Sequence, residues 1–280
     1  MQVTGIHAYP LKSGRARPLP AAQVEPWGLR GDRRWTVIDA DGEKVSARTD
    51  PRLFLIDAET SEFDDLDDAL RLSADGHPDL LLDTPQGPVV EVTIHGSPAP
   101  AIHAGARADA WIGAVLGRED VSLVWCPDPT VRTLDPEHSE PGDATAYADG
   151  FPVLLATEAS LRQLNAWVAE TARERGQQPT EVPMARFRPN IVIDGEVPFA
   201  EDDWSQVIIG EGPDALVLRS NSPCKRCVMT TVDPLSLERG PEPIRTLARH
   251  RRGLGGTLFA INLVPAAAGR IALGDRVTVR

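Results

Sequence analysis

Turn-forming residues divide this chain into short segments, and they constrain its fold more than any other feature. Its 280 residues include 25 prolines and 23 glycines, whereas aromatic residues make up only 5%. Proline cannot continue a helix or a central strand, and glycine favours tight turns. The composition therefore predicts many short strands and few long helices. The length leaves room for one large domain or two smaller ones.

Short β-branched or alternating runs dominate the first half of the chain. They predict strands at residues 35–39, 53–58, 70–73 and 89–95. The pair Asp41-Gly42 predicts a hairpin that joins 35–39 to a second strand at 43–47, because its tight turn needs a positive φ. One helix is predicted over 107–116, where apolar residues recur at helical spacing and Gly117 follows.

A proline-rich, acidic stretch separates this half from the second. Residues 126–149 have almost no apolar periodicity and are predicted to be a linker or lid between domains 1–125 and 150–280. The second half opens with a strand at 153–156 and a helix that begins after Thr157, a plausible N-cap, and runs to about residue 175. Further strands are predicted at 190–193, 206–209, 215–219, 228–232, 258–264 and 276–280.

The charge and the apolar runs exclude some classes of protein. The 29 Lys and Arg against 41 Asp and Glu give a net charge of −12, which opposes binding to a nucleic-acid backbone. No apolar run approaches the roughly 18 residues of a membrane-spanning helix. The first residues carry no basic and apolar secretory signal, so we expect a cytoplasmic protein that does not enter a membrane.

The sharpest local motif is Cys224-Lys225-Arg226-Cys227, for which three interpretations are open. A thioredoxin-type redox pair needs a following helix, whereas the β-branched run 228–232 predicts a strand. Structural zinc needs about four N or S ligands, and only Cys126 and six scattered histidines remain to complete such a site. Alternatively, both thiols fill the core as small apolar groups.

Cations gather beside this motif and beside three other predicted strand ends. They lie in the segments Tyr9-Pro-Leu-Lys-Ser-Gly14, Asp32-Arg-Arg-Trp35 and Arg186-Phe-Arg-Pro-Asn190, and next to the cysteines as Arg219, Lys225 and Arg226. Lysine and arginine bind phosphate, arginine through a bidentate fork. If these segments converge, they form an anion pocket whose cations favour the thiolate, the form that ligates a soft metal.

These motifs resemble the MOSC-domain proteins in their long form, among them the mitochondrial amidoxime-reducing components and their bacterial relatives. The likeness extends over nearly the whole chain, from Tyr9-Pro-Leu-Lys-Ser13 through Arg186-Phe-Arg-Pro-Asn-Ile-Val-Ile193 to Cys224-Lys-Arg-Cys227, Thr230-Thr-Val-Asp-Pro234 and Gly274-Asp275. The resemblance implies an α+β, mostly β fold. It comprises an N-terminal β-barrel-like domain and a C-terminal MOSC β-barrel domain with a few helices.

The resemblance also implies a molybdenum cofactor, held through a pterin with a phosphate tail. Cys227 would be the catalytic metal ligand, and Cys224 its packing neighbour. Matching the family motifs gives the cofactor-binding residues Lys12, Ser13, Arg33, Gly150, Phe151, Arg188, Asn190, Lys225 and Cys227. Two positions depart from the family. Gly150-Phe151 stands where eukaryotic members have Thr-Ser, which leaves only backbone donors, and Lys225 replaces a smaller, serine-like residue.

The implied activity is reduction of N-hydroxylated compounds such as amidoximes, hydroxylamines and N-hydroxylated bases. Some bacterial relatives add an iron–sulfur domain, whereas this chain ends at Arg280. We therefore expect a separate electron donor, a ferredoxin, a flavin reductase or a cytochrome b5-like protein, and a small-molecule N-oxygenated substrate. Two alternatives stay open: a sulfur-carrier or cofactor-handling protein that bears a persulfide on Cys227, and a β-rich binding module with inert cysteines.

Overall fold

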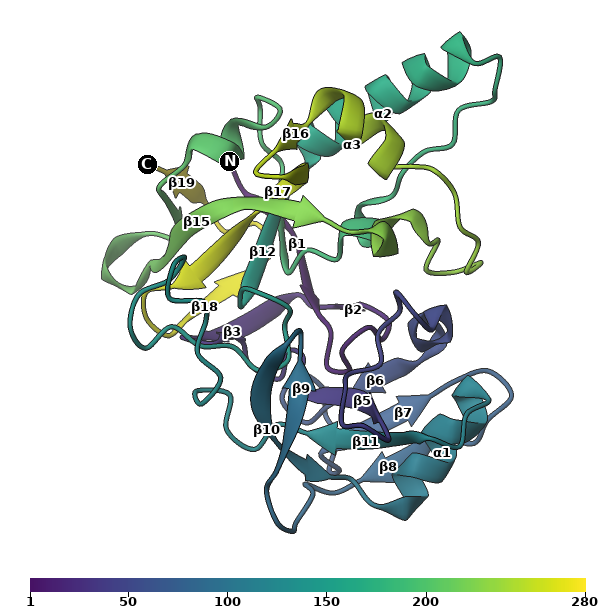
Figure 1. The fold of residues 1–280 in the computed structure, drawn as a ribbon. Helices are drawn as coiled ribbons and strands as arrows, with labels where there is room; N and C mark the ends of the chain where they lie inside the picture. Colours follow the sequence, from purple (N-terminus) through teal and green to yellow (C-terminus); the bar gives the residue numbers. More distant parts are fainter. The chain divides into compact units, whose positions relative to one another are not determined.

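The computed structural model describes all residues from Met1 to Arg280 and divides into two compact units (Figure 1). The C-terminal unit comprises Met1–His7, Pro20–Val24 and Val153–Arg280, and the N-terminal unit comprises Ala8–Leu19 and Glu25–Pro152. Strands hold 35% of the residues and helical segments 20%, so the predicted mostly β fold with a few helices is confirmed. The strand order does not close into a barrel.

One large sheet forms the centre of the C-terminal unit. Its strand order is β19-β14-β15-β17-β12-β13-β1, and β16 also pairs with β17. All these pairs are antiparallel except the parallel pair β12 and β13. The bounds are β1 (Val3–Ala8), β12 (Val153–Thr157), β13 (Ile191–Ile193), β14 (Gln206–Ile209), β15 (Leu216–Arg226), β16 (Arg252–Gly253), β17 (Gly256–Pro265) and β19 (Val277–Val279). A separate pair is formed by β3 (Ala21–Glu25) and β18 (Gly269–Ala272).

Two α-helices belong to this unit, α2 (Glu158–Glu174) and α3 (Ile244–His250). The Thr157 side chain accepts a hydrogen bond from the Ser160 amide, as the predicted N-cap should. Apolar residues of α2 pack with Leu247, Phe187 and Phe259 in one buried cluster. The 3₁₀ helices are η2 (Met184–Phe187), η3 (Ala200–Asp203), η4 (Gly212–Asp214) and η5 (Val228–Thr231).

The N-terminal unit contains two smaller antiparallel sheets. One has the order β5-β11-β10-β9 and the other β6-β7-β8. Their bounds are β5 (Trp35–Asp39), β6 (Asp57–Glu59), β7 (Leu70–Ser73), β8 (Leu80–Leu82), β9 (Val90–Ile94), β10 (Ser97–His103) and β11 (Val121–Trp125). The remaining elements are β2 (Arg17–Pro18), β4 (Gly28–Leu29), η1 (Pro51–Leu55) and the predicted helix α1 (Ala106–Leu116). Gly117 ends α1 in the left-handed conformation.

Three predicted strands are wrong, and local hydrogen bonds explain two of them. Residues 228–232 start with η5, because the hydroxyls of Thr230 and Thr231 donate to the carbonyls of Cys227 and Val228 at 3.0 and 2.7 Å. Residues 53–58 are split between η1, which begins at Pro51 after the N-cap Asp50, and the short strand β6. The predicted partner strand at 43–47 is reduced to two isolated bridges, one between Ile38 and Lys44 and one between Glu43 and Thr93.

The segment 126–149 contains no helix or named strand, yet part of it is buried. Ala146 and Tyr147 belong to a core cluster of the N-terminal unit, and the Tyr147 hydroxyl donates to the Pro100 carbonyl at 2.9 Å. The Arg132 guanidinium donates to the carbonyls of Ala146, Ala148 and Asp149. The end of this segment is thus packed into the N-terminal unit, and the boundaries 1–125, 126–149 and 150–280 stay a prediction.

Candidate functional site

In the N-terminal unit, the structure interlocks two of the predicted segments. The amides of Arg33 and Trp35 donate to the carbonyls of Tyr9 and Pro10 at 2.9 and 3.0 Å, and the Lys12 amide donates to the Trp35 carbonyl at 2.7 Å. These backbone bonds hold the turn that carries Lys12 and Ser13 beside the turn that carries Arg33. Three predicted site residues are therefore brought together.

The Lys12 ammonium is buried at this junction. Its Nζ lies 2.5 Å from Asp149 Oδ1 and donates to the Tyr147 carbonyl at 2.6 Å. Desolvation lowers the pKa of Lys12 to about 8, although the Asp149 carboxylate opposes this shift, and the charges of Arg33 and Arg132 lower it further. A buried amine whose pKa is shifted by burial and by neighbouring charges marks a candidate functional site.

Asp149 lies within the electrostatic reach of several cations. Desolvation raises the pKa of its carboxyl group, but the Lys12 charge and hydrogen bond outweigh that effect, and the pKa is lowered overall. His95 and Lys44 act on it in the same direction. Sequence reasoning missed Asp149 and the buried Arg132, because both fall in the segment taken for a linker or lid. The sequence feature that could have pointed to this group is Arg132, because residues 127–149 contain six acidic residues and no other Lys or Arg.

Backbone geometry singles out three of the predicted residues. Ser13, Arg33 and Arg188 have φ values of 66°, 49° and 55°, in the left-handed region that residues with a side chain seldom adopt. Such conformations are over-represented at binding sites, where the surrounding structure enforces them. The Arg33 guanidinium pairs with Asp32 and lies 4.5 Å from the Tyr9 ring centroid, so its direction is fixed.

Gly150 and Phe151 follow Asp149 in the same unit. Gly150 is exposed, and nothing lies within 4 Å of the position that a Cβ atom would occupy there. Phe151 is half-buried. The backbone at Gly150 is thus accessible beside the Lys12–Asp149 pair, as an amide contact to a ligand would need.

In the C-terminal unit, Asn190 joins two neighbouring strands. Its Nδ2 donates to the His7 carbonyl at 3.1 Å, and its Oδ1 accepts from the Leu154 amide at 3.2 Å. The side chain therefore connects β1 to β12 beside β13. Asn190 lies two residues after Arg188, which is buried and ends η2.

The cysteine motif lies against this same segment. Cys224, Lys225 and Arg226 are the last three residues of β15, and Arg226 Nη2 donates to the Phe187 carbonyl at 2.7 Å. Arg226 Nη1 lies 3.0 Å from the Cys224 sulfur. The structure thus brings the Cys224–Cys227 motif to the Arg186–Asn190 segment, as the anion-pocket interpretation expected for these two stretches.

Cys227 stands where β15 gives way to η5. Its carbonyl accepts hydrogen bonds from the amide and the hydroxyl of Thr230. Arg186 holds the next part of the loop, because its guanidinium donates to the carbonyls of Thr231 and Glu242 and pairs with Asp233. These bonds fix the backbone on the C-terminal side of the thiol.

The three thiols differ in burial. Cys224 and Cys227 are half-buried, so the interpretation that both fill a core is wrong, whereas Cys126 is buried. Desolvation raises the pKa of Cys126 to about 11. A helix of only four residues follows Cys227, and no group of three or more His, Cys, Asp or Glu residues is arranged to hold a metal ion. Any metal on Cys227 would need ligands from a bound group.

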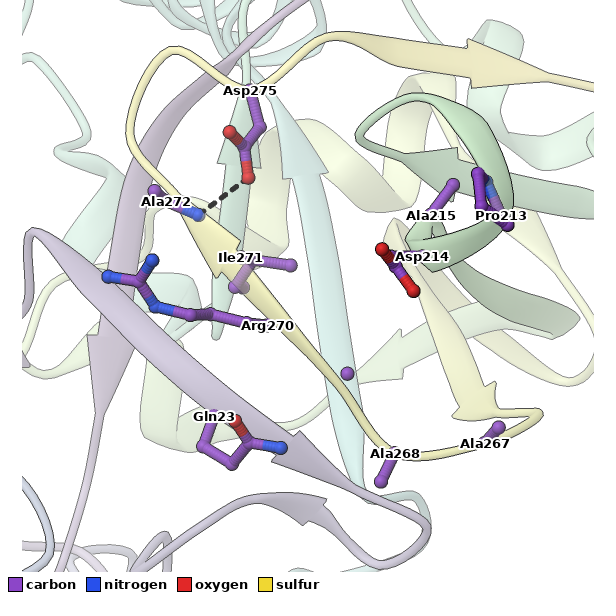
Figure 2. Close-up of a pocket in the computed structure, with 11 residues that line it drawn as sticks. Gln23, Pro213, Asp214, Ala215, Ala267, Ala268, Arg270, Ile271, Ala272 and Asp275 are labelled. Carbon is purple, nitrogen blue, oxygen red and sulfur yellow. Dashed lines mark hydrogen bonds between the residues drawn. The ribbon is translucent and has the colours of Figure 1, made fainter.

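The predicted residues therefore form two groups, one in each unit. Lys12, Ser13, Arg33, Gly150 and Phe151 belong to the N-terminal unit, and Arg188, Asn190, Lys225 and Cys227 belong to the C-terminal unit. A pocket of about 540 Å³ in the C-terminal unit contains none of them (Figure 2). Figure 2 shows Gln23, Asp214 and Arg270 at this pocket, together with Asp275, which accepts from the Ala272 amide.

Comparison with known families defines the class of protein. Residues 1–119 match the MOSC N-terminal beta barrel domain, and residues 142–278 match the MOSC domain. The chain belongs to the MOSC-domain family. The MOSC domain is named after the C-terminal domain of molybdenum cofactor sulfurases.

Several relatives align with most of the chain. Mitochondrial amidoxime-reducing component 1 of Mus musculus is 35% identical over 89% of this chain and 71% of its own length. The Homo sapiens protein of that name is 34% identical over 98% of this chain and 82% of its own. Among solved structures, the YUAD protein of Bacillus subtilis aligns with 99% of this chain and 93% of its own at 12% identity, with a TM-score of 0.42.

None of the helices reaches the length and apolarity needed to span a bilayer. The predicted cytoplasmic location stays a prediction.

Buried N–H groups without a hydrogen-bond partner indicate whether a phosphorylated, metal-bearing pterin suits these residues. The Nε atoms of Arg132 and Arg226 are buried and have no hydrogen-bond partner in the chain. Such orphaned N–H groups are costly unless an acceptor is supplied, and a phosphate or pterin offers acceptors. Taken unit by unit, the donors fit such a group: the N-terminal unit has Lys12 and Arg132, and the C-terminal unit has Arg226 beside a half-buried thiol.

Proposed function

We propose that this chain is a molybdenum-cofactor oxidoreductase that reduces N-hydroxylated compounds such as amidoximes, hydroxylamines and N-hydroxylated bases. The observation that carries the proposal is Cys227, a half-buried thiol at the end of β15 in a loop held by Arg186 and Thr230. A fixed, accessible thiol suits a soft metal ligand. The names of the relatives, which are amidoxime-reducing components, support the substrate class.

In this proposal the chain's residues divide the work of holding the cofactor. Lys12, Ser13, Arg33, Arg188 and Asn190 hold or position the phosphate and pterin, and the backbone at Gly150 and Phe151 adds amide donors. Lys225 lies beside the ligand, Cys227. When bound, the cofactor would supply the two-electron redox chemistry.

The overall reaction balances with two electrons and two protons. The N–O bond of the substrate breaks, the nitrogen is reduced, and the oxygen leaves as water. A separate electron-transfer protein is oxidised in return. The protonated Lys12 and the nearby arginines offset the negative charge of the phosphate, so their part is binding and orientation rather than proton transfer.

The matched pair of cysteines provides the test. In Cys227→Ser we expect at least about a hundredfold loss of amidoxime reduction with reduced methyl viologen as donor, because a hydroxyl is a poor soft-metal ligand. Cys224→Ser, three residues away in the same motif, should stay within about threefold of the unmodified protein. Unfolding curves check that both variants fold. Full turnover in Cys227→Ser would refute the ligand assignment.

A second candidate function is supported by the Arg226–Cys224 contact. A guanidinium 3.0 Å from a sulfur beside a half-buried Cys227 would also stabilise a persulfide, as a sulfur-carrier or cofactor-handling protein needs. Elemental analysis of the purified protein separates the two. One molybdenum per chain supports the reductase, and labile sulfur without molybdenum supports the carrier.

A further inference from the structure

Basic residues are segregated within the sheet that carries Cys227. The stretches 215–232 and 243–265 contain seven Lys and Arg and no Asp or Glu, whereas the rest of the chain holds 22 Lys and Arg and all 41 acidic residues. The seven are Arg219, Lys225, Arg226, Arg245, Arg249, Arg251 and Arg252. These stretches are neighbours in space, because β17 pairs with both β15 and β16. The result is a basic region in an acidic protein.

Only part of this positive charge is neutralised. Arg245, Arg249 and Arg251 pair with Glu242, Glu174 and Asp202, which come from outside the two stretches. Lys225 and Arg252, in contrast, are exposed and form no ion pair. Two free cations thus remain at the end of the sheet near the cysteines.

The hairpin between β16 and β17 carries an unusual tip. Leu254 has a φ of 49°, and 59% of its surface is exposed. Glycine or asparagine normally occupies a left-handed turn position, and a leucine there pays a conformational penalty without gaining burial. Left-handed conformations at residues other than glycine are concentrated at functional sites.

The hairpin is held in register with the cysteine motif. Arg252 pairs with Thr257, which pairs with Arg226, the residue before Cys227. Since neighbouring strands are about 4.8 Å apart, the Arg252 backbone lies about 10 Å from that of Arg226. Val228, on the other side of Cys227, is 51% exposed. Arg251 fixes the base of the hairpin through Asp202 and the Phe199 ring.

We propose that the hairpin tip at residues 252–255, with Lys225 and Val228, is the docking surface for an acidic electron-transfer protein. The inference rests on the proposed function, which needs such a donor. An acidic donor is repelled by the chain as a whole at −12 and attracted by this basic face, so it is steered to the surface around Cys227. Small interfaces with an apolar centre and charged rim are usual for weak electron-transfer complexes.

The test uses the holoenzyme and a double variant, Arg252→Glu with Leu254→Asn, whose asparagine tolerates the positive φ. The matched control is Arg270→Glu with Leu273→Asn, which changes another exposed, unpaired arginine and another exposed leucine of the same unit. The probes are a plant-type ferredoxin and a cytochrome b5 domain, each chosen with net negative charge. Binding is measured by calorimetry at low salt, and turnover with each carrier is compared with turnover driven by reduced methyl viologen.

We expect the double variant to weaken binding of an acidic carrier, and its kcat/KM, by about tenfold, and the control to stay within about twofold. Viologen-driven turnover should be unchanged in both. The docking proposal is overturned if neither carrier binds the unmodified enzyme, or if the two double variants bind equally. If the unmodified enzyme shows no viologen-driven turnover, the proposed reductase function is refuted. The binding measurements then still test the docking surface by themselves.

Discussion

The two groups of predicted site residues differ in how the protein holds them. In the N-terminal unit, Lys12 is buried and Arg33 is half-buried, and each cation is paired with a carboxylate, Asp149 or Asp32. In the C-terminal unit, Cys224 and Cys227 are half-buried, and Cys227 is followed by a short 3₁₀ turn. One group is built from desolvated charge, and the other from an accessible sulfur.

This difference matches two separate tasks. A buried charge is stable only with a counter-charge, so a site for an anionic ligand can be prepared in the free protein by an internal carboxylate. A reactive sulfur, in contrast, must be reachable, and rigid backbone around it supplies the positioning. The comparison implies that Lys12 and Arg33 contribute affinity for an anion and that Cys227 contributes reactivity.

Thiol reactivity gives the largest expected contrast. At pH 8 iodoacetamide should modify Cys224 and Cys227 readily, and Cys126 at least about a hundredfold more slowly, because Cys126 is buried and its pKa is raised to about 11. Mass spectrometry of a time course, with the modified peptides identified, measures the three rates. Equal rates would show that Cys126 is as accessible to the reagent as Cys224 and Cys227. Three unreactive thiols would favour the alternative of a β-rich binding module with inert cysteines.

Asn190→Ala should cause the next largest effect, a loss of about 3 kcal/mol in the free energy of unfolding. The substitution leaves the Leu154 amide and the His7 carbonyl without their side-chain partner beside a buried strand. Urea unfolding measures the change. Asn190→Asp retains an acceptor for Leu154 but places a carboxylate beside the His7 carbonyl in a buried position, so at neutral pH it should destabilise the protein at least as much as Asn190→Ala. If both substitutions are neutral, Asn190 does not join the strands.

The pKa of Lys12 predicts a pH-dependent anion affinity. Sulfate, whose charge is constant in this range, should bind the protein less tightly as pH rises through about 8, by about tenfold, because Lys12 then loses its proton. Lys12→Met should bind weakly at every pH. Calorimetric titrations from pH 6.5 to 9.5 provide the measurement. A flat profile in the unmodified protein, or one shared with Lys12→Met, would contradict the role of Lys12.

The same shift has a consequence for stability. Between about pH 8 and the unfolded value of 10.5, the unfolded chain binds more protons at Lys12 than the folded chain does. The free energy of unfolding should therefore rise with pH in this window, relative to Lys12→Met, by up to about 1.4 kcal/mol per pH unit. A difference that falls with pH would mean that the pKa of Lys12 is raised rather than lowered.

The sequence predicts strongly patterned elements well and locally determined ones poorly. The helix α2 after the Thr157 cap and the strand β14 follow from periodicity and capping alone. The helix α3 was not predicted, because it has only seven residues and depends on the Glu242 carboxylate, which accepts from the Thr246 amide. The strand β15 extends to Arg226, seven residues beyond its predicted end, because β17 pairs with it as far as Arg226, with two register shifts on the way.

The residues of the candidate site also divide into those that the sequence predicts and those that it does not. The clustering of cations beside predicted strand ends identified the segments that contain Lys12, Arg33 and Arg188, and the family resemblance selected these residues within them. Asp149, Arg132 and the Arg226–Phe187 contact depend on partners far apart in the chain, which periodicity does not reveal. The roles of the predicted residues in binding a cofactor stay a prediction.

Thr231→Val gives the smallest expected effect and tests why residues 228–232 do not form a strand. Valine has the shape of threonine but lacks the hydroxyl that donates to the Val228 carbonyl at 2.7 Å, and it favours extended backbone. We expect a loss of about 0.5–1 kcal/mol in the free energy of unfolding and a faster reaction of Cys227 with iodoacetamide, because the turn that holds it is loosened. Thr278→Val, at an exposed threonine of β19 in the same unit, is the matched control. If the rate at Cys227 is unchanged, Arg186 and Thr230 fix the turn without Thr231. The backbone around the thiol would then be held mainly by contacts with distant parts of the chain.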